Sequence, residues 1–553
     1  MPFQPHLPRR APLLAAVAFT LLVVALAFRS WDRYVEDRLG RWAVAELAGR
    51  TDSTYHLVLG DLSFLPLAGS LSFDSATIVT DSVRNHRRKT PLPGLRAQGR
   101  ECRVSGVDVS RLLFRRSFEA DALGCRRIVA VVTSASREKK KPRETTDTSG
   151  IAAPMRNLVR PLGLSAFRIA EVSFPALSLT FERLGRNGDA SVVLEHARFH
   201  AADLVLDLSA DSDTGHGVSA DRSRLEATGL LLRPDSATEI TVARLEANLT
   251  DSTLVLADAE HEPSMPDDEW VGRQRVRKDR VRFALDGLRA RGVAYRAFAG
   301  SGNIGIRAVE LRGARLDVLT DKRIPKGPPR RHRTPQQVAV RPGPELRLDT
   351  VLVTGGTVVY RERKPERERP GVVTFDTVRA TVLDLDLPSR GRRLRIDASA
   401  RLMEEGLLTV QASVPLDAPD FRYQLSGKLG RMSAKAFNRF LGENEPFEFD
   451  NGWVEGIGFR QDVKGGRATT TLTPRYRDLS VEPTGEGGGL IGSVKRAAQE
   501  FVAQTFVVRS RNPDEDGKNL RTARTVRRYD PAITWVQFLW FGLRDGLMEV
   551  LKE

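Results

Sequence analysis

The residues best suited to chemistry are few, and their spacing argues against an active site. His196 and His200 stand four apart in EHARFH and would share one face of a strand. A zinc site needs at least three protein ligands, and no third ligand stands near this pair. No Gly-rich phosphate loop, HExxH, GxSxG or paired CxxC occurs, and the carboxylates are scattered among arginines. We therefore expect no enzyme activity, no catalytic, cofactor-binding or metal-binding residues, and two surface histidines.

The two cysteines, Cys102 and Cys125, are too few for a zinc cluster or a disulfide scaffold. The segments CRVSGVDV and FEADALGCRRIV are nearly symmetric about RLLFRRS, which predicts a hairpin with the cysteines facing each other. Antiparallel neighbours approach to about 4.5 Å between Cα atoms, near the lower limit for a disulfide. In an oxidising compartment we expect the bond to form.

The residues 11–28 form an uncharged apolar run, APLLAAVAFTLLVVALAF, led by Arg9 and Arg10. Eighteen residues of helix span roughly 27 Å, close to a hydrocarbon core of about 30 Å. The run predicts a single-pass membrane anchor, with residues 1–10 in the cytoplasm and the bulk of the chain on the far side of the membrane. A cleaved signal peptide is the alternative, because residues 25–27 form an A-x-A site. Helical spacing of apolar residues then continues over 29–50. The members of that stripe are Trp31, Val35, Leu39, Trp42 and Ala43.

Most of the remaining chain alternates apolar and polar residues with the period of half-buried strands. This texture predicts a mainly β chain, antiparallel, with one apolar face. Segments 136–150, 209–223, 261–280 and 321–337 are charged or Pro-rich and predict surface loops. The net charge of +16 is spread along the chain, and aromatic residues are sparse, which argues against nucleic acid as a partner.

An internal repeat relates FRIAEVSFPALSLTFER, from Phe167, to LRLDTVLVTGGTVVYRE, from Leu346. The offset is 179, and it becomes 181 where Asp203-Leu204 matches Asp384-Leu385. Because each copy places the same alternation on the same face, we expect one apolar interior formed by both. The residues predicted to line it are Phe167, Ile169, Leu179, Phe181, Leu346, Leu348, Val358 and Tyr360. Those predicted to face water are Arg168, Arg347, Asp349 and Arg361.

The C-terminal part changes character, from strands to amphipathic helices. Residues 421–483 predict a strand, a helix from Ser433 to Leu441 capped by Gly442, and a three-strand meander. Two helical stripes follow, one within 490–505 and one after Pro531. The second stripe comprises Trp535, Phe538, Leu539, Leu543, Leu547 and Val550. The predicted β units are 51–208 and 281–420, joined by connecting strands in 209–280 and followed by segments 421–488 and 489–553.

These features together resemble the AsmA-like proteins of Gram-negative envelopes, in particular the branch related to YhdP and TamB. The phrases that carry the resemblance are LAGRTDSTYHLVLGDLSFLPLAGSLSFDSATI, VSGVDVSRLLF and FRYQLSGKLGRMSAKAFNRFL. The resemblance implies an elongated, twisted, repetitive β groove in the periplasm. It also implies phospholipid and the inner membrane as partners, with outer-membrane assembly or transport components as further ones. The chain is shorter than the larger members of the family, so the resemblance does not imply that it bridges both membranes.

A twisted and curled sheet wraps its apolar face into a trough that shields acyl chains from water. The alternative is a closed sandwich, in which the apolar faces pack on each other. The sequence therefore leaves two functions open: lipid handling for transport or outer-membrane biogenesis, and a structural or adaptor role without lipid.

Overall fold

The structure is a computed structural model that describes residues 36–551 with gaps. The gaps are 39, 42, 50, 66–68, 89–91, 109–110, 112–116, 136–165, 185–189, 208–217, 236–237, 264, 296, 299–302, 329–330, 342, 344, 389–390, 446 and 484–508. The predicted anchor at 11–28 and the predicted helix within 490–505 lie outside the described residues. Within the described part of the chain, no helix has both the length and the apolar character that a membrane crossing requires.

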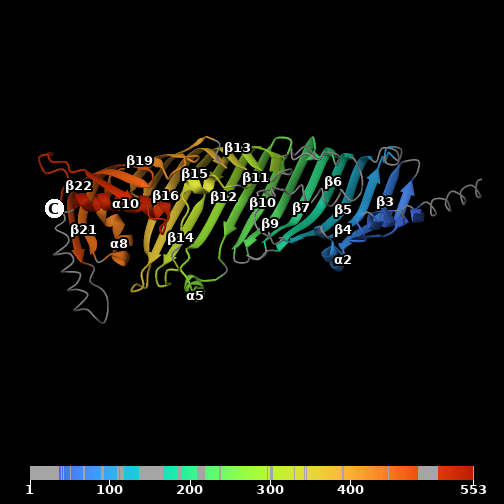
Figure 1. Cartoon of the computed structure of the whole chain (residues 1–553), viewed down its shortest axis with the longest axis horizontal. Coiled ribbons are helices and arrows are strands. Elements are labelled where there is room, and N and C mark those ends of the chain that lie inside the picture. Colours follow the sequence, from blue (N-terminus) through green and yellow to red (C-terminus); the bar gives the residue numbers. More distant parts are fainter. Residues whose placement is uncertain are drawn as a thin grey trace, which may run out of the picture. The chain divides into compact units, whose positions relative to one another are not determined.

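The fold is mainly β, as the alternating pattern predicts, and it divides into two compact units between Thr228 and Gly229. Figure 1 shows the long strands of each unit lying side by side. Unit 1 holds helix α2 (Ser82–Arg87) and strands β1 (Tyr55–Leu59), β2 (Leu62–Leu65), β3 (Ser70–Thr80), β4 (Gly94–Ser105), β5 (Ser117–Ala135), β6 (Ala166–Leu184), β7 (Ala190–Asp207) and β8 (Val218–Ser219). Strand β9 (Arg222–Asp235) contains the boundary.

Unit 2 holds the remaining strands and most of the short helices. The strands are β10 (Thr238–Asn248), β11 (Thr253–His261), β12 (Arg280–Val293), β13 (Ile304–Arg312), β14 (Arg315–Asp321), β15 (Leu346–Arg363), β16 (Gly371–Leu387), β17 (Arg393–Leu402), β18 (Gly406–Pro415), β19 (Tyr423–Leu429), β20 (Met432–Ser433), β21 (Phe447–Lys464), β22 (Arg467–Pro483) and β23 (Ala523–Arg528). The helices are α5 (Asp267–Arg273), α7 (Pro335–Ala339), the 3₁₀ turn η3 (Ala434–Phe437), α8 (Asn438–Asn444) and α10 (Trp535–Leu551).

The strand pairing is mixed, which corrects the expectation of an antiparallel sheet. Strand β6 runs parallel to β5, and β15 runs parallel to both β13 and β14. A parallel connection needs a crossover of a dozen or more residues, and residues 322–345 separate β14 from β15. The predicted Pro-rich loop at 321–337 thus falls in the connection between two parallel strands, whereas the predicted loop at 261–280 joins β11 to β12, which are antiparallel.

The two predicted repeat stretches have the same pairing and the same irregularities. Each pairs in parallel with the preceding strand and antiparallel with the following one. In β6 the register with β7 shifts around Leu177, and in β15 the register with β16 shifts around Gly356, at the same offset of 179. Bulges of this kind move the alternation by one residue, so apolar residues spaced by two and then by three stay on one face.

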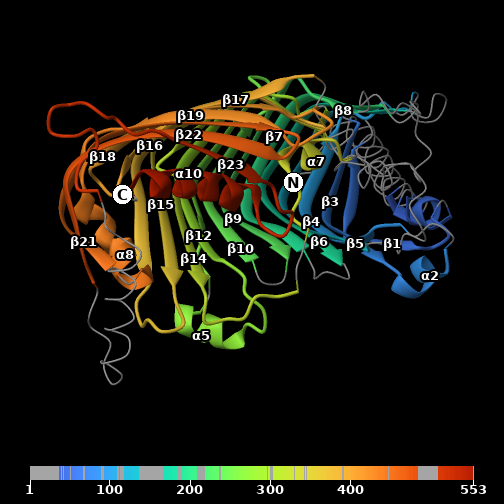
Figure 2. The same ribbon diagram turned by 60° about the vertical axis from the view of Figure 1, so that its left-hand side comes forward.

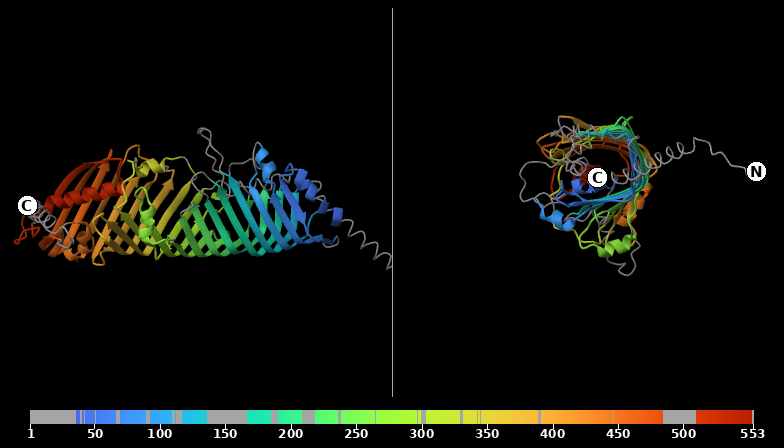
Figure 3. Two further views of the ribbon diagram at one scale, coloured as in Figure 1. Left: turned by 90° about the horizontal axis from the view of Figure 1, so that it is seen from below. Right: turned by 90° about the vertical axis from the view of Figure 1, so that its right-hand side faces the viewer.

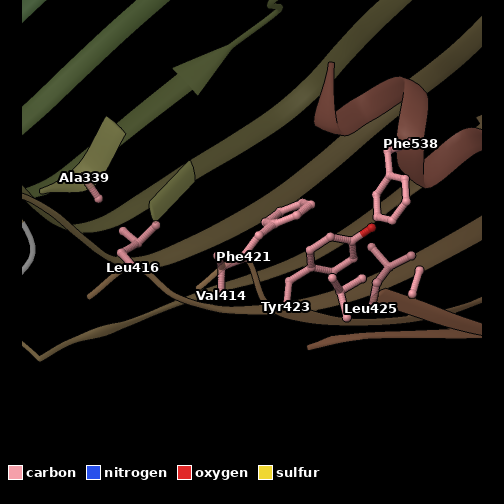
Figure 4. Close-up of a cluster of buried hydrophobic side chains, with 9 residues drawn as sticks. Ala339, Val414, Leu416, Phe421, Tyr423, Leu425 and Phe538 are labelled. Carbon is pink, nitrogen blue, oxygen red and sulfur yellow. The ribbon is translucent and has the colours of Figure 1, made fainter. Parts of the chain in front are cut away.

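A filled core closes one part of unit 2 (Figure 4). Helix α10 lies along the β21–β23 strands in Figures 2 and 3 and inserts Phe538, which is 0% exposed. The rings of Phe421 and Tyr529 lie 5.9 and 5.3 Å from that of Phe538, centroid to centroid. Helix α7 reaches the same core: its buried Gln336 donates from Nε2 to the carbonyls of Pro415, at 3.2 Å, and Arg422, at 2.6 Å.

The helix boundaries near the C-terminus differ in detail from the prediction. Ser433 does cap the turn that follows it, because its Oγ accepts from Lys435 N at 3.2 Å. Gly442 is not a C-cap: α8 continues through it to Asn444. Pro531 lies before α10 and not at its first position, because Thr534 and Gln537 form reciprocal cap bonds of 3.1 Å that begin the helix at Trp535.

The segment before β1 is helical in its described part, over 36–38, 40–41 and 43–49. Glu36 on this helix accepts a hydrogen bond from Phe64 N in β2 at 2.9 Å. The predicted connector is therefore helical where it is described, and it satisfies a backbone group of β2.

Candidate functional site

The residues predicted to line the apolar interior lie on long strands in both units. Ile169 is fully buried, and the other seven are half-buried, neither covered nor fully exposed. They are Phe167, Leu179, Phe181, Leu346, Leu348, Val358 and Tyr360. The first four residues of the prediction lie in unit 1 and the last four in unit 2, so each set is described by itself.

In unit 1, one end of β6 belongs to a packed cluster. Ile169 packs there with Val172 and Ala201, and the Phe167 ring stacks on Phe118 with 4.8 Å between centroids. The other end of β6 is less covered. Leu179 pairs with Leu194, and Phe181 pairs with Val192, which is 37% exposed.

In unit 2, the corresponding end of β15 is also partly open. Val358 lies between Leu316 of β14 and Phe375 of β16, and Leu316 is 39% exposed. Tyr360 is the neighbour of Val318 and Val373. Apolar cross-strand rows thus continue over three strands. On the β16 side, Val373 packs against the buried cluster of Met403, Leu429, Met432 and Val454, and α8 contacts both β15 and β16.

The opposite end of β15 borders the filled core. Leu346 and Leu348 pair with Leu387 and Leu385, which pack against the cluster around Phe538. The structure therefore does not place all four β15 residues in one open surface. Val358 and Tyr360 lie at the partly exposed end beside Leu316, and Leu346 and Leu348 lie beside the core that contains Phe538.

A hollow of about 920 Å³ crosses strands β15 to β22 between these regions. Its middle row consists of cross-strand neighbours, and small residues leave room along it. That row is Val353, Ala380, Ala398, Val410, Gly427 and Phe459. The polar neighbours of the row, among them Arg379, Asp397 and Lys428, also border the hollow. Its volume falls within the range of small-molecule sites. Sequence reasoning missed it, because its residues come from seven strands.

Three of the four residues predicted to face water do so to different extents. Arg168 is exposed, the Arg347 side chain is 54% exposed, and that of Asp349 is 35% exposed. Arg361 is the exception, with a side chain only 18% exposed. It is held by Asp317, whose Oδ1 accepts from Nε at 2.8 Å, and by Asp267, whose Oδ2 accepts from Nη1 at 3.0 Å.

Arg361 belongs to a charged cluster, absent from the sequence predictions, on the other face of β15. Alternation places Leu319, Arg361 and Arg363 on that face, where Leu319 is 0% exposed and the two arginines bond to Asp267 and Asp268 of α5. Asp267 also accepts from Arg282 Nη2 at 2.6 Å, and Asp268 accepts from Arg323 and Arg363 at 2.8 and 2.6 Å.

The electrostatics of this cluster follow from burial and charge-assisted hydrogen bonds. Burial raises the pKa of Asp267, but the hydrogen bonds from Arg282 and Arg361 together lower it by more than burial raises it. The pKa therefore lies below its usual range. Hydrogen bonds from Arg323 and Arg363 hold the pKa of Asp268 low. Burial lowers the pKa of Arg280, whose guanidinium also lies 5.6 Å from the centroid of the Trp270 ring. Both aspartates are therefore ionised at neutral pH.

Cys102 and Cys125 face each other as the hairpin pattern predicts. They are partners in the β4–β5 pair and are joined by a disulfide bond, with 4.0 Å between their Cα atoms. The bond lies in unit 1 and joins two cysteines that are 23 residues apart in the sequence.

His196 and His200 are both exposed on β7. No group of three or more His, Cys, Asp or Glu side chains able to hold a metal ion is found in the described residues.

Comparison of the chain with protein-family models finds no match, and comparison with curated proteins finds no similar sequence. The function must therefore be argued from the molecule itself.

Proposed function

We propose that this chain is an inner-membrane-anchored periplasmic protein that handles phospholipid acyl chains on the apolar face of its β-sheet. The observation that carries the proposal is the half-buried state of the apolar rows around Leu179, Phe181, Val358 and Tyr360. Beside them, Val192 in unit 1 is 37% exposed and Leu316 in unit 2 is 39% exposed, and neighbouring apolar side chains that stay accessible to water are typical of a binding surface. A surface of this kind fits an acyl chain, because each CH₂ removed from water contributes about 0.8 kcal/mol.

The architecture is consistent with movement of lipid without chemistry. Repeated bulges keep apolar side chains on one face along β6 and β15, so a chain lying there meets the same surface at successive positions. Headgroups would remain in water at the strand ends. Residues 11–28 supply the expected anchor, and transport toward the outer membrane or support of its assembly is the role implied by the AsmA-like resemblance. We propose that the groove is elongated and repetitive.

The direct test is mass spectrometry of an organic extract of the purified full chain. We expect stoichiometric phospholipid in the wild type and its loss in Val358→Asp and Leu179→Asp, because a carboxylate in the apolar row opposes burial of an acyl chain. Arg347→Glu is the matched control: it changes charge on the same strand as Val358 at an exposed position, and it should retain lipid. Wild-type protein free of lipid would end the proposal.

A role as a scaffold or adaptor is the second candidate, and the filled core around Phe538 favours it. There, α7 and α10 occupy the apolar face with their own side chains, as in a structural domain. A scaffold predicts no copurified lipid, unchanged extracts in Val358→Asp, and recovery of partner proteins by crosslinking.

A further inference from the structure

The face of β15 opposite to Val358 carries a group of arginines that the lipid proposal does not use. Strand β12 contributes Arg280 and Arg282, strand β15 contributes Arg361 and Arg363, and Arg323 follows β14. Arg280 and Arg361 both pair with Leu319 in β14, one on each side. Adjacent strands lie about 4.8 Å apart, so the guanidinium groups are held above one small area of the sheet.

The charges of this area do not balance until α5 is added. Five arginines meet three carboxylates, those of Glu262, Asp317 and Asp321, which leaves two positive charges. Asp267 and Asp268 at the start of α5 neutralise these two. Two adjacent carboxylates of one loop thus bring the negative charge and the acceptor oxygens that one doubly ionised phosphate group, or two singly charged phosphodiester groups, would bring.

Arg280 retains hydrogen-bonding capacity that the aspartates leave unused. Its side chain is 1% exposed, and Nε lies 2.8 Å from Asp267 Oδ1. Its buried Nη1 has no hydrogen-bond partner within the described part of the chain. A buried donor without a partner is costly, and a tetrahedral anion with more acceptor oxygens than a carboxylate would satisfy it.

The segment that supplies the aspartates is suited to displacement. Residues 262–279 connect β11 and β12, and α5 within them is only seven residues long. Its N-cap, Pro266, makes no side-chain cap bond, and the Asp268 side chain is 73% exposed although both of its arginine partners are more buried. The end of the loop is fixed separately, because Arg277 donates to the carbonyls of Ile324 and Lys322, so a competing anion would need to replace only the arginine bonds of Asp267 and Asp268.

We propose that Arg280, Arg282, Arg323, Arg361 and Arg363 form a phosphate-binding site that Asp267 and Asp268 of α5 occupy in this structure. Guanidinium groups bind phosphate through paired hydrogen bonds, which gives both strength and geometry. The ligand class is a phosphomonoester, a phospholipid headgroup or inorganic phosphate. The site goes beyond the proposed function, because it lies on the opposite face of β15 and does not require a bound acyl chain.

The test compares the full chain in detergent with a D267N/D268N variant, which removes the competing charges with little change in volume. Inorganic phosphate is titrated calorimetrically, and vesicles of phosphatidylglycerol or of phosphatidylcholine are used for co-sedimentation. We expect phosphate affinity to rise by about tenfold in the variant, which corresponds to about 1.4 kcal/mol. Adding R361Q/R363Q should abolish the gain. Phosphatidylglycerol binding without phosphate binding would identify a headgroup site, and the reverse result a site for soluble phosphate.

A second variant keeps the inference falsifiable if the amide side chains of D267N/D268N still hold α5 in place. Residues 266–273 are replaced by a Gly-Ser linker of equal length, so that no α5 side chain can fill the site. If neither variant binds phosphate or phosphatidylglycerol more tightly than the wild type, while circular dichroism shows an intact β-sheet, the inference is wrong. Lipid copurification in the wild type is a separate readout, so failure here leaves the acyl-chain proposal standing, and the converse also holds.

Discussion

Gly542 of α10 lies against the Gln461 side chain of β21, so closely that a Cβ built on Gly542 would stand 2.2 Å from Gln461 Nε2. Gln461 is 0% exposed, and its Nε2 donates to Thr470 Oγ1 at 2.9 Å. The same Cβ would stand 2.8 Å from that hydroxyl. Helix and strand therefore meet through a buried polar pair at a position where only glycine fits.

We predict that Gly542→Ala lowers the free energy of unfolding by about 1–3 kcal/mol through overpacking, despite a gain in helix propensity of up to about 1 kcal/mol. Thermal unfolding followed by tryptophan fluorescence measures this, because Trp535 and Trp540 lie on α10. Gly546→Ala is the matched control: its Cβ would meet Leu472 Cβ at 3.3 Å, so the loss should be smaller. Equal effects of the two substitutions would contradict the role assigned to Gln461.

The disulfide bond gives a second prediction, for unit 1. Closing a loop of this length restricts the unfolded chain by about 3 kcal/mol in the chain-entropy model. We expect the Cys102→Ala/Cys125→Ala variant to unfold at lower denaturant concentration than the wild type. Reduced wild type is the control, because it keeps both buried sulfur atoms. The residues Cys102 and Cys125 are 3% and 8% exposed. The prediction fails if reduction leaves the transition of the wild type unchanged.

Acidification should release α5. The pKa of Asp267 and of Asp268 is lower in the folded protein than the ordinary value near 3.9, because arginines favour the ionised form. The ion pairs therefore stabilise the docked loop fully above about pH 5, and that contribution is lost as pH falls below about 4 through the folded pKa. The groups facing the aspartates are Arg280, Arg282, Arg323, Arg361 and Arg363.

The measurement is the fluorescence of Trp270, which lies on α5 beside Arg280, obtained as the difference between the wild type and Trp270→Phe. We expect a transition below about pH 4 in the wild type, because the folded pKa of both aspartates is lowered, and none in D267N/D268N. A transition of the same size in that variant would assign the pH dependence to other groups.

The sequence predicts features that depend on local pattern. The mainly β fold follows from two-residue alternation, and the cysteine pair follows from the symmetry of one hairpin. The bulges were not predicted, although the apolar spacing in FRIAEVSFPALSLTFER changes from two to three where a strand must bend to keep its face.

Features that depend on distant partners could not be predicted. Alternation is the same in parallel and antiparallel strands, so nothing local shows that β15 runs parallel to β14. Arg361 looks like an exposed residue of a polar face, and its burial depends on Asp267, 94 residues earlier in the chain. Likewise Leu346 and Leu348 carry no sign that their strand partners pack against a core containing Phe538.

The last prediction concerns Asp203 of β7, which takes a left-handed backbone conformation with φ 49° and is exposed. It lies between Ala202 and Leu204, which pair with Glu171 and Ile169 of β6. Asp384 takes the matching position of β16, with φ 61°. Aspartate tolerates this conformation better than β-branched residues do, and the bend keeps the apolar side chains of the strand on one face.

We expect Asp203→Val to lower the free energy of unfolding by about 1–2 kcal/mol, the cost of left-handed backbone for a residue with a Cβ, and Asp203→Gly to be neutral or slightly stabilising. Glu195→Val is the control, because it places the same side chain at an exposed position of β7 outside the bend, where strand propensity favours valine. Chemical denaturation of the three variants and the wild type measures the difference. If Asp203→Val is tolerated as well as Glu195→Val, backbone conformation does not select aspartate at this position, and the shared bend of β7 and β16 has another cause.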